Sequence, residues 1–153
     1  MGRRQPALFL YNPRLMDRLW AARRIIDERF AEPLTIDEIG RVAGLSTYHF
    51  IRAFRRAFGC TPGRYLRERR LTRARQLLAT CDLAVTDVCL AVGFESLGSF
   101  CTLFRRSEGE TPAAFRARHV ARRTAAAARP PFVPGCFLRM SGVSSPRPKI
   151  TAA

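Results

Sequence analysis

Apolar positions in the first patterned segment, residues 13–31, recur at steps of three or four. That spacing places them on one face of an α-helix, at Leu15, Leu19, Ala22, Ile26 and Phe30. Pro33 follows closely, and a proline disfavours helical geometry in the residue before it. The pattern therefore predicts one amphipathic helix that ends ahead of Pro33.

The segment after Pro33 predicts a short helix over residues 36–43 that ends in a tight turn. Thr35, with Glu38 three residues later, forms a capping box, which is typical of a helix start. The apolar positions that this helix is expected to bury are Ile36, Ile39, Val42 and Ala43. Gly44 is suited to the positive φ that commonly closes a helix, so we expect the turn there.

A second helix is predicted over residues 47–58, directly after the turn. Leu45 is expected to enter the core, and Ser46 is expected to cap the helix. Phe50 and Phe54, four residues apart, face the core, and Gly59 ends the helix. Two short helices joined by a glycine turn form a helix-turn-helix motif, here at about 35–59.

The same pattern occurs a second time, with matching residues 50 positions apart. Ser46, Phe50, Phe54, Gly59, Thr61 and Pro62 correspond to Ser96, Phe100, Phe104, Gly109, Thr111 and Pro112. Upstream the offset is 49, as between Gly44 and Gly93, because the second turn is one residue longer. This internal repeat predicts a second copy of the motif at about 85–109.

A longer helix is predicted between the two motifs, at about 62–80. Thr61 is a helix cap, and Pro62 suits the first turn, where a missing N–H does no harm. The apolar stripe of this helix comprises Tyr65, Leu66, Leu71, Ala74, Leu77 and Leu78. Some 18 residues give a strut of roughly 27 Å. We expect that strut to set the motifs about one DNA turn apart, roughly 34–36 Å.

The net charge of the chain narrows the class of binding partner. The 153-residue chain has a formal net charge of +15, and all but Lys149 of its 27 lysine and arginine residues are arginine. Arginine binds phosphate bidentately, so the excess favours a polyanion. Charge alone does not separate DNA from RNA, a ribosome or an anionic membrane. No apolar run reaches the roughly 18 residues of a membrane-spanning helix, and a cytoplasmic protein with no membrane partner is expected.

No metal site, cofactor or catalytic site is expected. No two of the five cysteines are spaced as C-x-x-C, which favours buried thiols over disulfides or metal ligands. The two histidines, His49 and His119, complete no Ser/His/Asp set, and no glycine-rich phosphate loop occurs. We therefore expect a protein that is not an enzyme.

Two segments carry a family resemblance. They are EPLTIDEIGRVAGLSTYHF with the residues that follow it, and the more specific GF-x-S-x3-F-x3-FRR-x2-G-x-TP-x2-FR at 93–116. They resemble the DNA-binding domain of the AraC/XylS family of bacterial transcription regulators, over about Leu15 to Arg118, around two-thirds of the chain. The resemblance implies a homeodomain-like, all-α fold of seven helices, with the long helix linking two helix-turn-helix subdomains.

The resemblance also implies how the chain is organised. Residues 13–118 are expected to form the DNA-binding domain, after an N-terminal arm at 1–12. Residues 119–153 are expected to form a basic, proline-rich, partly disordered tail. The chain is similar to small stand-alone members that act as monomers. It is thus expected to bind double-stranded promoter DNA in the bacterial nucleoid and to regulate transcription with RNA polymerase, more often by activation than repression.

The first recognition helix has the stronger chemistry for reading bases. Its candidates, on the side away from Phe50 and Phe54, are Thr47, Tyr48, Ile51 and Arg52. Arg52 ranks first because arginine bidentate to guanine is the commonest specific contact; contact with phosphate alone is the alternative. The second helix offers Leu97, Ser99 and Thr102, which are poor in hydrogen-bonding groups, so a weaker reader is expected.

Phosphate contacts are expected from helix caps and from arginines late in each recognition helix. These candidates are Ser46, Arg55, Arg56, Thr61, Ser96, Arg105, Arg106 and Thr111. The resemblance gives Arg116 a structural role, tying the last helix to the second subdomain. Two other classes stay open. One is a basic architectural nucleic-acid-binding protein with little sequence specificity, and the other is a reduced metabolite sensor formed by the N-terminal helix and the tail.

Overall fold

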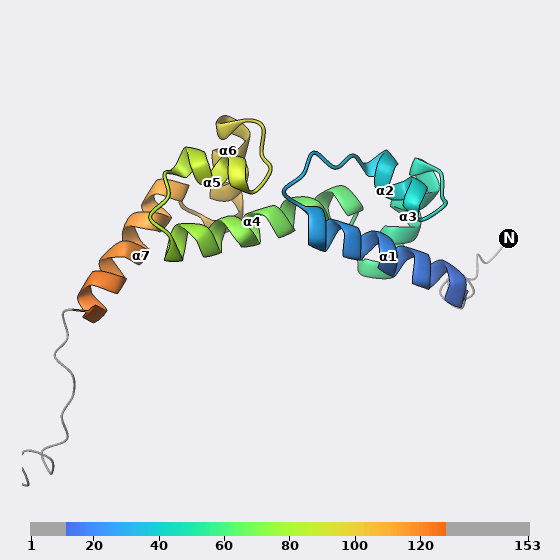
Figure 1. Ribbon diagram of the computed structural model, residues 1–153, viewed down its shortest axis with the longest axis horizontal. Helices are drawn as coiled ribbons and strands as arrows, with labels where there is room; N and C mark the ends of the chain where they lie inside the picture. Colours follow the sequence, from blue (N-terminus) through green and yellow to red (C-terminus); the bar gives the residue numbers. More distant parts are fainter. Residues whose placement is uncertain (1–11, 128–153) are drawn as a thin grey trace, which may run out of the picture. The chain divides into compact units, whose positions relative to one another are not determined.

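The computed structural model describes residues 12–127, which form seven α-helices. In chain order they are α1 (Pro13–Arg29), α2 (Ile36–Val42), α3 (Thr47–Phe58), α4 (Pro62–Thr80), α5 (Val85–Ala91), α6 (Leu97–Glu108) and α7 (Pro112–Ala127) (Figure 1). Residues 12–127 contain no strand, so the all-α prediction is confirmed. Most of the predicted arm and tail, residues 1–11 and 128–153, lies outside the described residues.

One hydrophobic core joins α1, α2, α3 and the first half of α4. Leu19, Ala22 and Ile26 of α1 are fully buried, as their periodicity predicts. Phe50 and Phe54 of α3 pack with ring centroids 5.5 Å apart, in the edge-on geometry that aromatic pairs favour. Burial of each such side chain contributes about 1.5–3 kcal/mol. The remaining buried members of this core are Ile39, Ala43, Ala53 and Leu66.

A second core joins the second half of α4 with α5, α6 and the start of α7. Phe100 and Phe104 are fully buried here, in the places that the 50-residue repeat assigns to them. Phe94, Phe100, Phe104 and Phe115 form a continuous chain of rings, with successive centroids 5.2, 5.7 and 5.4 Å apart. The other buried members are Leu71, Ala74, Leu78, Val88, Cys89 and Val92.

Helix α4 contributes to both cores, and its observed bounds are those predicted from the sequence. Leu66 packs in the first core, while Leu71 and Leu78 pack in the second. In Figure 1, α4 accordingly runs from the helices of the first motif to those of the second. The two cores are therefore connected by one continuous helix.

Glycine closes the turn in both motifs, as predicted. Gly44 has φ +58° and Gly93 has φ +85°, backbone conformations that other residues rarely adopt. In the first motif, the guanidinium of Arg18 on α1 donates from Nε to the Ala43 carbonyl and from Nη2 to the Gly44 carbonyl. These bonds satisfy carbonyls at the end of α2 that the helix itself leaves unpaired.

The prediction for α2 is confirmed at Ile39 and Ala43, which are buried, and at Ile36, which packs against the same core. It is wrong at Val42, which is 57% exposed. Gly40 is buried instead, and a Cβ placed there would lie 3.4 Å from the Cβ of Phe50. The backbone of α2 thus approaches α3 at Gly40, which turns Val42 toward solvent. Leu45 is only partly buried against the same core.

Two further predictions differ from the structure. Ser46 precedes α3 but makes no side-chain cap; its hydroxyl pairs with Nδ1 of His49 at 2.9 Å. Helix α7 continues past Arg118 to Ala127, into residues expected to belong to the tail. The alanine and arginine residues in this stretch have high helix propensity, which explains the extension.

A hydrogen bond between side chains ties α2 to α3. Thr47, at the start of α3, donates from Oγ1 to Oδ1 of Asp37 at 2.6 Å. This bond is the main reason that the pKa of Asp37 lies below its ordinary value, and the charge of Arg41 acts in the same direction. The hydroxyl of Thr47 is therefore committed within the protein.

Replacing glycine by alanine is expected to have opposite effects at two positions. Gly93→Ala places a side chain at positive φ, which costs about 1–2 kcal/mol before any steric clash. Gly98→Ala, in the first turn of α6, is expected to stabilise the fold by up to about 1 kcal/mol. The nearest atom to a Cβ at Gly98 is Ser96 Oγ at 3.8 Å, so there is space for the methyl group. Urea unfolding of both variants checks the prediction; equal effects would contradict it.

Thr47→Val is expected to lower stability in a pH-dependent manner. The lowered pKa of Asp37 means that its bond with Thr47 stabilises the fold above the ordinary pKa of aspartate and is lost as the pH falls through the lowered pKa. The difference from the unmodified protein should be largest at neutral pH and shrink below about pH 4. Urea unfolding between pH 7 and pH 2.5 measures it.

Thr102→Val is the matched control, because the Thr102 hydroxyl donates to the Gly98 carbonyl rather than to a carboxylate. Its effect should not depend on pH. A Thr47→Val effect that stays constant to pH 2.5 would show that Asp37 is not the partner that matters.

Candidate nucleic-acid interface

The exposed face of α3 presents an ordered pair of side chains, Tyr48 and Arg52. Tyr48 is 65% exposed. Arg52, one turn later, donates from Nη1 to the Tyr48 hydroxyl at 3.1 Å, and its guanidinium carbon lies 5.4 Å from the centroid of the ring. The two predicted base readers therefore hold each other in place, with the charged group at the surface.

The other two predicted base readers of α3, Thr47 and Ile51, are less exposed than this pair. Ile51 is partly buried, so only part of its side chain can meet a partner. Thr47 is also partly buried, and its hydroxyl donates to Asp37. Of the four predicted base readers on α3, Tyr48 and Arg52 are those that the structure presents together.

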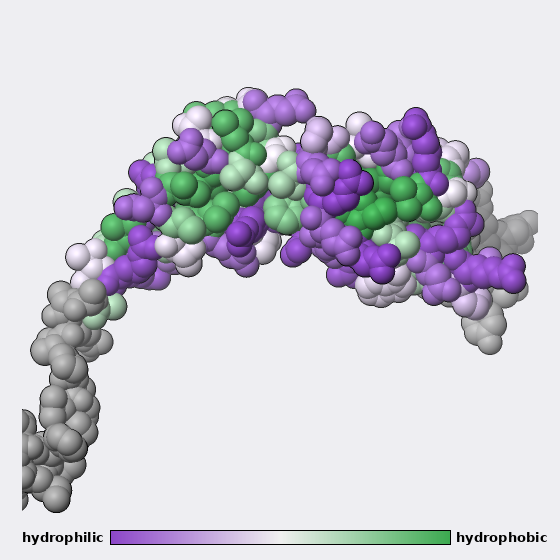
Figure 2. Space-filling view, viewed as in Figure 1, coloured by the Kyte–Doolittle hydropathy of each residue, from purple (hydrophilic) through white to green (hydrophobic). Residues whose placement is uncertain are grey.

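The exposed face of α6 is poorer in polar groups, as the sequence predicts. Leu97 is 42% exposed, and the exposed Thr102 uses its hydroxyl as a donor to the Gly98 carbonyl at 2.9 Å. Ser99 is exposed beside them. Figure 2 shows apolar surface in the region of α5 and α6, and a second apolar area in the first motif that is bordered by hydrophilic surface. The second helix thus offers shape and apolar contact more than hydrogen bonds.

Three of the four predicted phosphate contacts at helix starts are, first of all, helix caps, and Ser46 is the exception. Thr61 Oγ1 accepts from the Arg64 amide at 3.4 Å, and Thr111 Oγ1 accepts from the Ala114 amide at 3.3 Å. Ser96 Oγ accepts from the Ser99 amide at 3.4 Å. These caps hold the first turns of α4, α7 and α6, whose amide groups and helix dipoles favour an anion.

Arginines late in each recognition helix are exposed, as predicted: Arg55 and Arg56 on α3, and Arg105 and Arg106 on α6. Within residues 12–127, no ion pair involves Arg52, Arg55, Arg105 or Arg106. Other arginines are paired, as Arg75 is with Glu108 at 3.0 Å. Both recognition helices therefore carry exposed arginine charge with no acidic partner among the described residues, as do Arg64 and Arg67 of α4.

Several arginines have structural roles that the sequence did not predict. Arg23 on α1 donates to the Tyr65 hydroxyl at 2.9 Å, and that hydroxyl donates to Asp27 at 2.9 Å. Asp27 also forms an ion pair with Arg69 at 2.6 Å, which fixes α4 on α1. These partners lie 38 to 42 residues apart, so no local pattern identifies them. Arg116 behaves as the resemblance implied, because it donates to the Leu83 carbonyl at 2.7 Å ahead of α5.

Among the described residues, no cluster of histidine, cysteine or acidic side chains is arranged to hold a metal ion. Cys89 is buried in the second core, and burial raises the pKa of its thiol, which disfavours the reactive thiolate. Cys60, Cys81 and Cys101 are also free thiols. No helix within residues 12–127 has the length and apolar character to cross a membrane.

Comparison with known proteins identifies the family. Residues 39–118, which include both turns and both recognition helices, match the family described as "Helix-turn-helix domain". Among curated proteins, the probable transcription factor PqrA of Proteus vulgaris is 39% identical over 85 residues, which cover 56% of this chain and 70% of PqrA.

Two solved structures share the fold. The DNA-binding domain of the global transcriptional factor AdpA, solved in complex with a target DNA, is 33% identical with a TM-score of 0.66, covering 69% of this chain and 96% of that domain. A regulator with an AraC-type DNA-binding domain from Chromobacterium violaceum is also 33% identical, with a TM-score of 0.62, covering 68% and 93%. With its two glycine turns, its two recognition helices and these matches, the chain belongs to the AraC-type helix-turn-helix family of DNA-binding transcription regulators.

Proposed function

We propose that this protein activates transcription by placing α3 and α6 in two successive major grooves of promoter DNA, with α3 as the stronger reader. The chain binds as a monomer, because each molecule carries two recognition helices. RNA polymerase is the partner through which bound protein acts on transcription.

The observation that carries this proposal is the Tyr48–Arg52 pair on α3. An arginine can donate two parallel hydrogen bonds to O6 and N7 of guanine, and the adjacent ring can contact a thymine methyl or a sugar. The hydrogen bond from Arg52 to Tyr48 limits the rotamers of both side chains before DNA binds. Less conformational entropy is then lost on binding, which favours affinity.

The unequal chemistry of α3 and α6 favours sequence-specific binding over the architectural alternative. A protein that only neutralises phosphate needs basic charge but no distinct surfaces on its two motifs. Here α3 presents Tyr48 and Arg52, whereas α6 presents Leu97 and Thr102. One strong and one weak half-site are therefore expected within a single binding site.

Selection of bound duplexes from a random DNA pool tests the proposal directly. We expect one bipartite sequence, with a well-defined half-site and a less defined one about one helical turn, roughly 34–36 Å, away. Competition with scrambled DNA at several salt concentrations then separates specific from nonspecific binding. Recovery of no common sequence, together with equal affinity for scrambled DNA, would favour the architectural alternative.

Arg52→Ala is expected to relax specificity at one base position of the stronger half-site, by about 1–3 kcal/mol of discrimination. Binding to duplexes that differ only at that position measures the change. Arg55→Ala is the matched control, since Arg55 is an exposed arginine on the same helix. Its loss should weaken all sequences equally and lower the salt slope by about one. Uniform weakening by Arg52→Ala as well would assign Arg52 to phosphate.

A further inference from the structure

Arg70 lies in the stretch of α4 between its two cores, which extends from Leu66 to Leu71. Its guanidinium donates from Nε to the Phe30 carbonyl at 2.7 Å and from Nη2 to the Glu32 carbonyl at 2.9 Å. Phe30 is the C-cap of α1, so the cation also faces the negative end of that helix dipole. Arg70 therefore binds α4 to the loop that follows α1.

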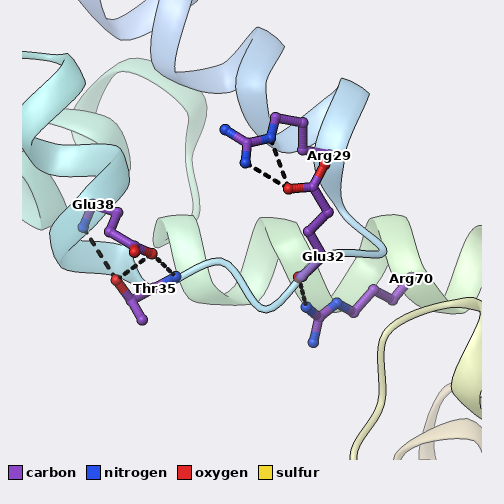
Figure 3. Close-up of polar contacts among 5 residues, drawn as sticks. All are labelled: Arg29, Glu32, Thr35, Glu38 and Arg70. Carbon is purple, nitrogen blue, oxygen red and sulfur yellow. Dashed lines mark hydrogen bonds and ion pairs between the residues drawn. The ribbon is translucent and has the colours of Figure 1, made fainter.

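The loop that receives Arg70 is itself ordered by polar contacts. Arg29 donates from Nε to the Glu32 carboxylate at 2.9 Å, while Arg70 binds the carbonyl of the same residue (Figure 3). The capping box of Thr35 and Glu38 begins α2 three residues later. The loop is thus held at Glu32 by two arginines and at its end by a helix cap.

The other side of Arg70 faces the second motif. Its guanidinium carbon lies 5.8 Å from the centroid of the Phe94 ring, which packs in the second core. Glu95 follows directly, and its negative charge raises the pKa of Arg70, against the larger lowering by burial. Glu95 occupies the place where the repeat offset changes from 49 to 50, so it is the extra residue of the second turn. Arg70 thus contacts residues on the side of both motifs.

The backbones of the two motifs also meet beside Arg70. A Cβ on Gly93 would lie 2.6 Å from the Ala31 carbonyl oxygen and 2.9 Å from its carbon, closer than real Cβ contacts. In the first motif, the three atoms nearest to the corresponding Cβ on Gly44 would all belong to the guanidinium of Arg18. The turn at Gly44 is thus covered by a flexible side chain, that of Arg18. The turn at Gly93 is covered by the main chain of Ala31, which precedes α2.

We propose that these contacts, centred on Arg70 and formed by residues 30–32, Arg70 and residues 93–95, set the spacing and rotation of α6 relative to α3. This inference rests on the proposed two-groove function. The segment of α4 between the cores is a single helix, and long helices bend. A small bend or twist there would move α6 away from its groove while leaving α3 in place. Arg70 is a positioning residue in this scheme, since its contacts lie within the protein.

Arg70→Lys tests the proposal while keeping the charge. Lysine cannot reproduce the planar fork that binds two carbonyls, yet its long-range attraction to phosphate is the same. Arg73→Lys is the matched control, because Arg73 is on the same helix and exposed, and within residues 12–127 its side chain bonds only to that of Gln76. Each full-length protein is measured against three duplexes: the selected bipartite site, that site with one base pair inserted between its halves, and the stronger half-site alone.

We expect Arg70→Lys to bind the half-site as the unmodified protein does, which also shows that its first motif is folded. Its affinity for the bipartite site should fall roughly fivefold, the lower end of typical coupling between sites. The penalty for the inserted base pair should shrink, because a loosened α6 adapts to altered spacing. Glu95→Gln should reduce that penalty in the same direction, whereas Arg73→Lys should leave all three affinities and the penalty unchanged.

Two results would overturn the inference. One is an unchanged insertion penalty in Arg70→Lys, and the other is an equal loss of affinity for the half-site and the bipartite site. Neither result bears on the proposed function, which fails only if the unmodified protein does not prefer the selected site to scrambled DNA. The inference about Arg70 and the proposed function can therefore be refuted independently of each other.

Discussion

The burial of α4 in two hydrophobic cores is the constraint on which the rest of the structure depends. Leu66 joins the first core, and Leu71, Ala74 and Leu78 join the second. Each of these side chains leaves water only if α4 is helical and both motifs are packed on it, so neither motif is independent of the helix. Ion pairs and hydrogen bonds along α4, such as those of Tyr65 and Arg69 with Asp27, then fix which way the helix faces.

A shared architecture does not make the motifs equivalent. Phe50 and Phe54 are repeated as Phe100 and Phe104, and the turn glycines adopt the same left-handed conformation. The surfaces differ, because residues that do not enter the core are free to vary without loss of packing. The α3 surface carries an aromatic–arginine pair, and the α6 surface carries a leucine, a glycine and small hydroxyl groups. A duplex bound along both motifs would thus be read mainly at one end.

Arginine has two separate uses in this chain. Arg18, Arg70 and Arg116 donate to main-chain carbonyls at helix ends or in loops, where the planar guanidinium satisfies acceptors that the helices leave open. Arg52, Arg55, Arg105 and Arg106 are exposed and take part in no ion pair within residues 12–127. The basic composition therefore overstates the charge available to a ligand, and the location of each arginine decides its role.

The sequence by itself determined the helices, the repeat, the turn glycines and the face of α3 that carries Tyr48 and Arg52. These features are local, since apolar spacing, caps and glycine act within one or two helical turns. The exposure of Val42, the commitment of Thr47 to Asp37 and the contacts of Arg70 were decided only by the tertiary structure. Each depends on which residues of distant segments come within a few ångströms. In the sequence, an arginine that binds a carbonyl 40 residues away cannot be distinguished from one that is available to bind phosphate.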